Sequence, residues 1–333
     1  MRVGMAAATE ARVPDVVDLR NIRARDLNPL LEEEIKEWRT RLDWDFRPSA
    51  DLVRRFVAMQ SLPGHALVVG GEVAGYTYLV SDEGKGLIGD LYIAGPYHTH
   101  ENEARLLEAG LRELFEVMLV RRVESQLMLL RSPGRYPLPY AQWLRAHPRG
   151  FMLMDVSRVA GLKPGPAARK ALIETWSMRR MDEAAQVIAS AYQGHIDGDV
   201  NDQYQSVTGA RRFLSNLIQY PGCGAFFQPA SFVAIDVWTG RACGISLASM
   251  LSPGVGHITQ ICVVPTLKGK GLGYELLRRS LVALAEAGCR KASLTVTLAN
   301  RDAVRLYERM GFVTAHAFSA LVWDTELRPL GSG

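Results

Sequence analysis

The sequence predicts a mixed α/β protein in which two similar halves follow one another along the chain. Its 333 residues exceed the roughly 150 that one domain usually contains, which indicates two domains. In the C-terminal half, apolar strand patterns alternate with helical patterns. The N-terminal half repeats part of that order, which indicates an internal duplication.

The C-terminal half has a clear order of elements. We expect strands where apolar and β-branched residues gather between turn residues, and helices where apolar residues recur on one face. The expected strands are Trp176–Arg180, Ser231–Trp238, Arg241–Met250, His257–Val264, Ala292–Leu298 and Phe312–Asp324. The expected helices are Met181–Tyr192, Val207–Gln219, Tyr274–Ala287 and Asp302–Met310.

The N-terminal half contains a similar series. Residues 65–93 hold two strands joined at Gly70 and Gly71 and then a third strand, and a helix is expected from Glu101 to Leu119. Subtracting 170 from the numbers of the later helix aligns leucine pairs in both helices. Residues 161–170 are rich in glycine and proline, so we predict domains at 1–160 and 171–333 with a linker between them.

Composition excludes several classes of protein. The chain has 48% hydrophobic residues, 22% charged residues and a net charge of +4, which does not indicate a nucleic-acid partner. No run of about 18 apolar residues occurs and the amino terminus has no sustained apolar segment, so we expect neither a membrane partner nor a signal peptide. The four cysteines are far apart, which favours free thiols, no metal and a cytoplasmic location.

A glycine-rich turn stands between a predicted strand and a predicted helix. The stretch 263-VVPTLKGKGLG-273 contains Lys268, Gly269, Lys270, Gly271, Leu272 and Gly273. Backbone N–H groups at a helix start have no partner within the helix, and glycines let an anion approach closely. The turn therefore suits a pyrophosphate, although a plain basic connection fits as well.

Two motifs together resemble a known family. The loop K-x-x-G-x-G after V-x-P is similar to the pyrophosphate loop [Q/R]-x-x-G-x-[G/A] of the GNAT superfamily of acyl-CoA-dependent N-acyltransferases, with Lys268 in the place of Arg or Gln. The stretch 300-NRDAVRLYERMGF-312 resembles the family's N-x-x-A-x-x-L-Y-x-x-x-G-F. The resemblance covers residues 171–325 and implies acetyl-CoA as the cofactor.

The family's cofactor site can be carried over residue by residue. The resemblance implies two tandem GNAT-like domains with mostly antiparallel sheets, each with a splayed pair of central parallel strands that admits the pantetheine arm. In this sequence the backbone of Cys262, Val263 and Val264 would face the arm, and Lys268 to Gly273 would hold the pyrophosphate. Asn300 serves equally well as a helix cap or as a cofactor contact.

The resemblance names one catalytic acid but no base. Tyr307 would protonate the leaving thiolate, although a core aromatic beside Phe312 is the alternative. The strand before the loop has no acidic residue, so His257 is a candidate base, or a structural histidine, and Gln260 would orient a water. A covalent role for Cys262 is not expected, because a cysteine in a buried strand usually packs as a small hydrophobe.

The polar stretch 195-HIDGDVNDQY-204 lies where the family places its acceptor site. Asp197, Asp199 and Asp202 would bind a cationic amine, or they form turns and cap the next helix. Both interpretations stay open.

The N-terminal half differs at the corresponding loop. Subtracting 170 places Glu101 and Glu103 where Gly271 and Gly273 stand, and carboxylates at a helix start repel a phosphate. The tyrosine motif has no counterpart in residues 140–151, where Pro148 would also disturb a helix. We therefore expect a degenerate first domain that does not bind CoA.

The sequence leads to one function and one alternative. The expected function is acetyl transfer from acetyl-CoA to a primary amine, of a small molecule or a peptide, in a ternary complex. The alternative is a non-catalytic acyl-CoA-binding or sensing protein. The first half would shape the acceptor cleft or mediate a homodimer.

Overall fold

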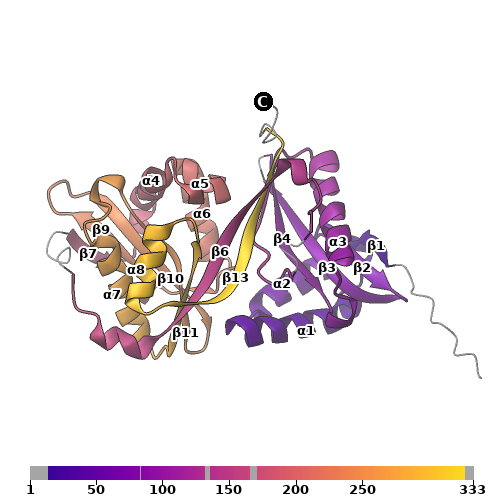
Figure 1. The fold of residues 1–333 in the computed structure, drawn as a ribbon, viewed down its shortest axis with the longest axis horizontal. Coiled ribbons are helices and arrows are strands. Elements are labelled where there is room, and N and C mark those ends of the chain that lie inside the picture. Colours follow the sequence, from indigo (N-terminus) through magenta and orange to yellow (C-terminus); the bar gives the residue numbers. More distant parts are fainter. Residues whose placement is uncertain (1–13, 83, 132–135, 166–170, 327–333) are drawn as a thin grey trace, which may run out of the picture.

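One sheet runs through both halves of the molecule (Figure 1). The computed structural model describes residues 14–82, 84–131, 136–165 and 171–326. The strands follow the order β1-β2-β3-β4-β5-β13-β6-β12-β11-β10-β9-β7, and β8 pairs with β10. They are β1 (Asp15–Asp18), β2 (Gly64–Val69), β3 (Glu72–Asp82), β4 (Lys85–Ile93), β5 (Arg122–Ser125), β6 (Leu144–Asp155), β7 (Ala171–Thr175), β8 (Ala225–Phe226), β9 (Phe232–Asp236), β10 (Ala242–Ser252), β11 (Val255–Val263), β12 (Lys291–Thr297) and β13 (Val313–Asp324).

Helices pack on both faces of this sheet. They are α1 (Ala24–Leu42), α2 (Arg47–Ala58), α3 (His100–Arg112), α4 (Met181–Tyr192), α5 (Ile196–Val200), α6 (Val207–Gln219), α7 (Leu272–Glu286) and α8 (Arg301–Met310). In the C-terminal half, α7 and α8 share a buried cluster with Leu294 and Val296 of β12, while α4 and α6 pack on Ile245 and Leu247. Because side chains alternate along a strand, odd-numbered residues of β12 face away from the α7–α8 cluster.

The predicted duplication is confirmed, and the offset of 170 fits the central strands. When 170 is added to the residue numbers at the two ends of β3, they match the two ends of β10, and those of β4 match β11 in the same way. In each half, four pairs of residues link the two parallel strands, from Lys85 to Ile88 in β4 and from Val255 to Ile258 in β11. The register of the antiparallel neighbour then shifts, at Gly89 in one half and at Thr259 in the other. Past this bulge the parallel strands separate, as the resemblance implied.

The two halves exchange their last strands. β6, from the first half, pairs with β12, and β13, from the second half, pairs with β5. β6 and β13 also pair with each other and cross between the two lobes in Figure 1. Each half of the sheet therefore contains one strand from the other half of the chain. The predicted linker 161–170 separates the two halves in sequence but does not separate the two halves of the sheet. Residues 166–170 of this linker lie outside the described residues.

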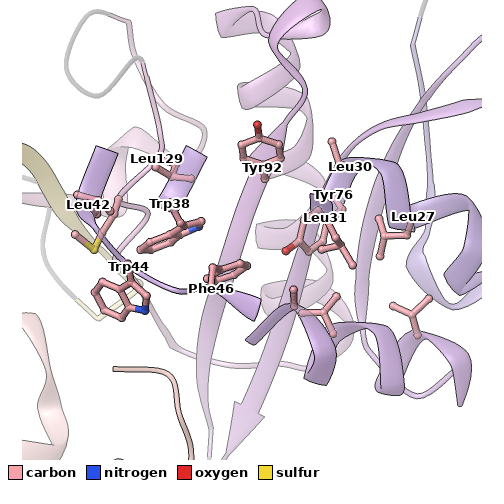
Figure 2. Packing of buried hydrophobic residues seen from close by; sticks show 14 of the residues in the cluster. Leu27, Leu30, Leu31, Trp38, Leu42, Trp44, Phe46, Tyr76, Tyr92 and Leu129 are labelled. Atoms are coloured by element: carbon pink, nitrogen blue, oxygen red, sulfur yellow. The ribbon is translucent and has the colours of Figure 1, made fainter. Parts of the chain in front are cut away.

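Aromatic packing fills the seam between the halves. Trp38 stacks on Phe46 with ring centroids 4.9 Å apart (Figure 2). The ring of Trp44 lies 5.7 Å from the ring of His257. The same buried cluster includes Phe151 and Phe318 from the exchanged strands. Burial of such large rings makes the seam a continuous core rather than a loose contact.

Two expected elements differ from the structure. The strand expected at Trp176–Arg180 is wrong, because β7 pairs with β9 over 171–175 and Ser177 then caps a 3₁₀ turn at Met178–Arg180. In the first half, α3 ends at Arg112 and a π-helical turn covers Glu113–Val117. Among the described residues, no helix is long and apolar enough to cross a membrane, and no group of three or more His, Cys, Asp or Glu is placed to hold a metal ion.

Candidate active site

A cleft of about 670 Å³ opens in the C-terminal half, where β11 and β12 separate. Its walls come from both separated strands, from the loop before α7, from α8 and from the segment around α5. The volume is in the range of pockets that enclose a small ligand. Past Ile258 and Leu294 the facing edges of the two strands are not paired with each other, so backbone groups there can bind a ligand, although the carbonyl of Ile261 accepts the Tyr192 hydroxyl at 3.3 Å.

The loop before α7 forms one end of the cleft. Gly269 and Gly271 have positive φ angles of 77° and 84°, which a residue with a Cβ adopts only at a cost. Gly271 is the N-cap of α7, and among the residues that the structure describes no side chain caps this helix. Lys268, Gly269, Gly271 and Gly273 line the cleft, so N–H groups and a cation meet where a pyrophosphate fits.

The other predicted loop positions have different surroundings. Lys270 is exposed and does not line the cleft, and Leu272 is buried in the core against Leu276. Cys262 and Val263 line the cleft, whereas Val264 does not and donates its N–H to the carbonyl of Cys243 at 2.9 Å.

The thiol of Cys262 is buried. Burial raises its pKa to about 12, although a hydrogen bond from the side chain of Gln260 opposes the rise. The thiol is therefore protonated near neutral pH, which does not favour a covalent role.

Helix α8 brings Tyr307 to the cleft. Asn300 caps this helix, because its Oδ1 accepts the N–H of Ala303 at 3.3 Å, and it lines the cleft as well, so its two predicted roles are compatible. Tyr307 packs on Phe312 and is 8% exposed. Burial raises the pKa of Tyr307 above its usual range, and the charge of Asp197 adds to the rise. The phenol therefore keeps its proton and is available as a donor.

The opposite wall holds a hydrogen-bonded acidic group. Asp197, on α5, accepts a hydrogen bond from the hydroxyl of Thr297 and lines the cleft. Nε2 of Gln260 donates to the Tyr192 hydroxyl at 3.0 Å, and the Tyr204 hydroxyl lies 3.4 Å from Oε1 of the same glutamine. The predicted Asp197 and Gln260 therefore meet in one wall.

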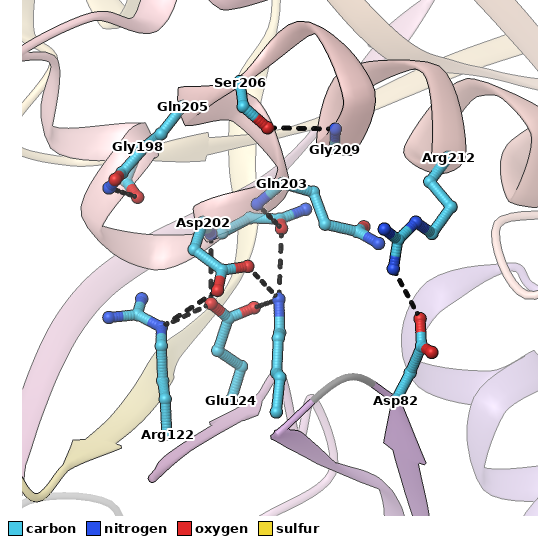
Figure 3. Close-up of polar contacts among 12 residues, drawn as sticks. Asp82, Arg122, Glu124, Gly198, Asp202, Gln203, Gln205, Ser206, Gly209 and Arg212 are labelled. Carbon is cyan, nitrogen blue, oxygen red and sulfur yellow. Dashed lines mark hydrogen bonds and ion pairs between the residues drawn. The ribbon is translucent and has the colours of Figure 1, made fainter.

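The other two aspartates of the polar stretch are not in the cleft. Asp199 is exposed, and its carbonyl accepts a hydrogen bond from Arg122 of the first half. Asp202 pairs with Lys85 and lies close to Glu124 (Figure 3). Substrate binding by Asp199 is therefore not supported, because its surroundings belong to the seam between the halves.

His257 is not placed as a base. Its Nδ1 lies 2.8 Å from the hydroxyl of Ser293, its ring stacks near Phe151, and it is not among the residues that line the cleft. Burial lowers the pKa of His257 to about 3, with a smaller contribution from the positive charge of Arg149. A structural histidine fits these observations, and a general base at neutral pH does not.

Sequence reasoning missed several residues of the cleft. Arg305 and Arg309 lie on either side of Tyr307 in the sequence of α8, and both line the cleft. Their spacing of four residues within the quoted motif indicated that they share one face of the helix. His195 was inside the polar stretch, and its Nδ1 accepts the N–H of Asp197 at 3.2 Å. Arg149 lies in the other half, and no local pattern marks it.

In the described part of the first half, the corresponding helix start is closed by side chains. Helix α3 is capped by Thr99, whose hydroxyl accepts the N–H of Asn102 at 3.1 Å. Glu103 is fully buried, lies 2.7 Å from His98 and accepts the N–H of Arg131. The small cavity beside them measures about 10 Å³, which is room for about one water.

The first half also differs at the second motif and at Glu101. Residues 144–155 form strand β6 rather than a helix, so the structure gives them no tyrosine-bearing helix. Glu101 is exposed and pairs with Arg105 at 2.6 Å. Of the two glutamates predicted to replace the glycines of the loop, only Glu103 therefore fills the loop position.

Comparison with known proteins agrees with this geometry. Residues 200–312 match the acetyltransferase (GNAT) family. Over 103 residues the chain is 36% identical to a mycothiol acetyltransferase of Acidimicrobium ferrooxidans, an alignment that covers 30% of this chain and 33% of that protein. The chain spans about a third of the length of the first curated relatives that it matches.

Solved structures extend the similarity to the whole fold. A GCN5-related N-acetyltransferase from Sphaerobacter thermophilus superposes with a TM-score of 0.66 at 16% identity and covers 94% of this chain and 96% of that one. A tandem GNAT protein from the clavulanic acid biosynthesis pathway gives a TM-score of 0.58 at 15% identity, over 95% and 99% of the two chains. Residues 200–312 are thus similar to the GNAT acetyltransferases, and the solved structures show that the chain has the GNAT fold in tandem.

Proposed function

We propose that this protein transfers an acetyl group from acetyl-CoA to a primary amine, and that only the C-terminal half holds the cofactor. The observation that carries the proposal is a single cleft in which an uncapped helix start, two separated strand edges and a buried tyrosine meet. The first half has its helix start capped and its loop position filled by Glu103.

The residues of the cleft suit the parts of acetyl-CoA. The N–H groups at the start of α7 and the side chain of Lys268 would hold the pyrophosphate. The free edges of β11 and β12 would bind the amides of the pantetheine arm, as a sheet edge binds a peptide. Bound acetyl-CoA supplies a thioester carbonyl, at which a new C–N bond forms as the C–S bond breaks.

Two side chains are positioned to move the protons. Asp197 accepts from Thr297 at one carboxylate oxygen, and its second oxygen lies 3.5 Å from Nδ1 of His195, which accepts the N–H of Asp197. This second oxygen would bind the acceptor ammonium and remove a proton, directly or through a water. Tyr307, kept protonated by burial, gives its proton to the leaving sulfur and regains one from solvent. An ammonium loses two protons on its way to the neutral amide: one balances the proton that reaches the thiol, and the other is released to solvent.

The test is acetylation of a panel of amines by the wild type and Tyr307→Phe. We expect the substitution to lower kcat about 100-fold or more without changing the Kd of acetyl-CoA measured by calorimetry. Tyr220→Phe, at an exposed tyrosine outside the cleft, is the matched control and keeps full activity. Binding of acetyl-CoA without turnover of any amine would favour a sensing protein instead.

A further inference from the structure

Arg149 reaches the cleft from the first half of the chain. It lies on the exchanged strand β6, directly opposite Thr297 of β12. Residues directly opposite in an antiparallel pair point to the same face of the sheet. Thr297 donates its hydroxyl proton to Asp197, so Arg149 and Asp197 lie on the same side, facing away from the α7–α8 cluster.

The charge of Arg149 is not neutralised within the described part of the chain. No carboxylate there forms an ion pair with it, and its buried Nε has no hydrogen-bond partner among the described residues. Arg122, at the same seam, contrasts with it, because it pairs with Glu124 at 2.8 Å and with Asp324 at 3.2 Å. A guanidinium with a buried, unpaired N–H costs free energy, which an anionic ligand would recover.

The two charged groups act on the same tyrosines of the cleft. Burial raises the pKa of Tyr204, the charge of Arg149 opposes the rise, and the charge of Asp197 adds to it. The same two charges act on Tyr307 after the larger effect of burial. A cation and an anion thus face the reacting end of one cleft, from different halves of the molecule.

We propose that the acceptor is a primary amine that also carries a carboxylate, and that Arg149 binds this carboxylate while Asp197 binds the ammonium group. This inference rests on the proposed acetyl transfer. The planar guanidinium matches a carboxylate through two parallel hydrogen bonds, a geometry that lysine lacks. The cofactor phosphates are not the expected partner, because their cradle at the start of α7 belongs to the other face.

This arrangement explains what the first half contributes. Its own cofactor position is filled, yet its last strand completes the acceptor wall. Its Lys85 and Arg122 also hold the segment after α5 through Glu124 and Asp202 (Figure 3). The acceptor site is therefore built from both halves, while the cofactor cradle is built from one.

The test compares amino acids with the amines left by their decarboxylation. We expect the wild type to prefer the amino acids, and Arg149→Gln to raise their KM about 10- to 100-fold while leaving the KM of the decarboxylated amines and the Kd of acetyl-CoA unchanged. Arg149→Lys, which keeps the charge without the planar fork, should lie between the two. Arg145→Gln, at an exposed arginine on the same strand, is the control and changes neither constant.

A binding measurement separates this inference from the proposed function. Calorimetric titration of N-acetyl amino acids into the CoA-bound protein needs no turnover, and Arg149→Gln should lose the binding that the wild type shows. Absence of turnover with every amine would contradict the acetyltransferase proposal, and the titration would still decide on Arg149. A wild type that binds no carboxylate, or an Arg149→Gln variant that loses acetyl-CoA with unchanged acceptor preference, would overturn the inference.

Discussion

The starts of helices α3 and α7 occupy equivalent places in the two halves, but they satisfy their backbone groups differently. At α3 the hydroxyl of Thr99 accepts the N–H of Asn102, and the buried carboxylate of Glu103 lies in the same turn and accepts the N–H of Arg131 from another segment. At α7 the N-cap is Gly271, and no side chain in the described part of the chain caps the helix. A helix start that its own chain leaves uncapped, on a scaffold that elsewhere caps the same position, is available to a ligand.

The comparison also shows what each arrangement costs. A capped helix start contributes to stability, whereas an uncapped start with two positive φ angles gives up that contribution. Sites that break local rules for stability are where function is expected. In the proposed function the two halves therefore divide the tasks, with the cofactor cradle in the second and additional bracing of the acceptor wall from the first.

The largest effect is expected on acetyl-CoA binding, when a loop residue of the second half is replaced by its counterpart from the first half. Gly273→Glu repeats Glu103, and the site has room for it, because a Cβ there would meet only Val263 at 3.8 Å. A carboxylate beside the pyrophosphate should weaken acetyl-CoA binding roughly 100-fold, about 3 kcal/mol, in calorimetry at low salt. Gly273→Gln has nearly the same shape without the charge and should retain most of the affinity. Equal loss in both variants would show that size rather than charge separates the two loops.

The seam gives a second comparison, between His257 and Leu87, which stands 170 positions earlier. Leu87 is 40% exposed, whereas His257 is buried against Trp44 and Phe151 of the other half. Burial lowers the pKa of His257 to about 3, well below the value near 6.5 in an unfolded chain. As the pH falls, His257 is therefore protonated in the unfolded chain before it is protonated in the folded protein. Its contribution to the free energy of unfolding is fully present above pH 6.5 and is lost as the pH falls toward 3.

The corresponding measurement is urea unfolding at pH 7 and pH 5 for the wild type and His257→Asn. Between pH 7 and pH 5, His257 should lower the free energy of unfolding of the wild type by about 2 kcal/mol. The variant should not show this part of the decrease. Both proteins share the contributions of their other titrating groups, so the difference of the two losses isolates this residue. Equal losses would mean that His257 is protonated in the folded protein.

Local patterns made the conformations of the glycine-rich loop and of helix α8 predictable. The turn from Lys268 to Gly273 and the helix that carries Tyr307 are each contained in a dozen residues, and their conformations follow from glycine, capping and apolar spacing. Asp197 was found for a similar reason, as part of an unusually polar stretch beside a helix start.

The acceptor wall was not predictable in the same way. The sequence of β6 indicates at most that residues 144–155 form an extended strand. It does not indicate which strands β6 pairs with, so Arg149 could not be placed opposite Thr297. His257 looked like a candidate base because its burial under Trp44 depends on contacts more than 200 residues apart in sequence. The interactions that decide these roles are long-range, and one sequence does not record them.

The smallest expected effect tests the cap of the first half. Thr99 is exposed, and its hydroxyl accepts the N–H of Asn102, so Thr99→Ala should lower the free energy of unfolding by about 1 kcal/mol. Thr99→Ser keeps the acceptor and should retain most of that stability. Neither substitution should change the Kd of acetyl-CoA, because α3 lies in the half whose loop position Glu103 already fills. A weaker Kd in Thr99→Ala would place cofactor contacts in the first half, and the division of tasks between the two helix starts would then be wrong.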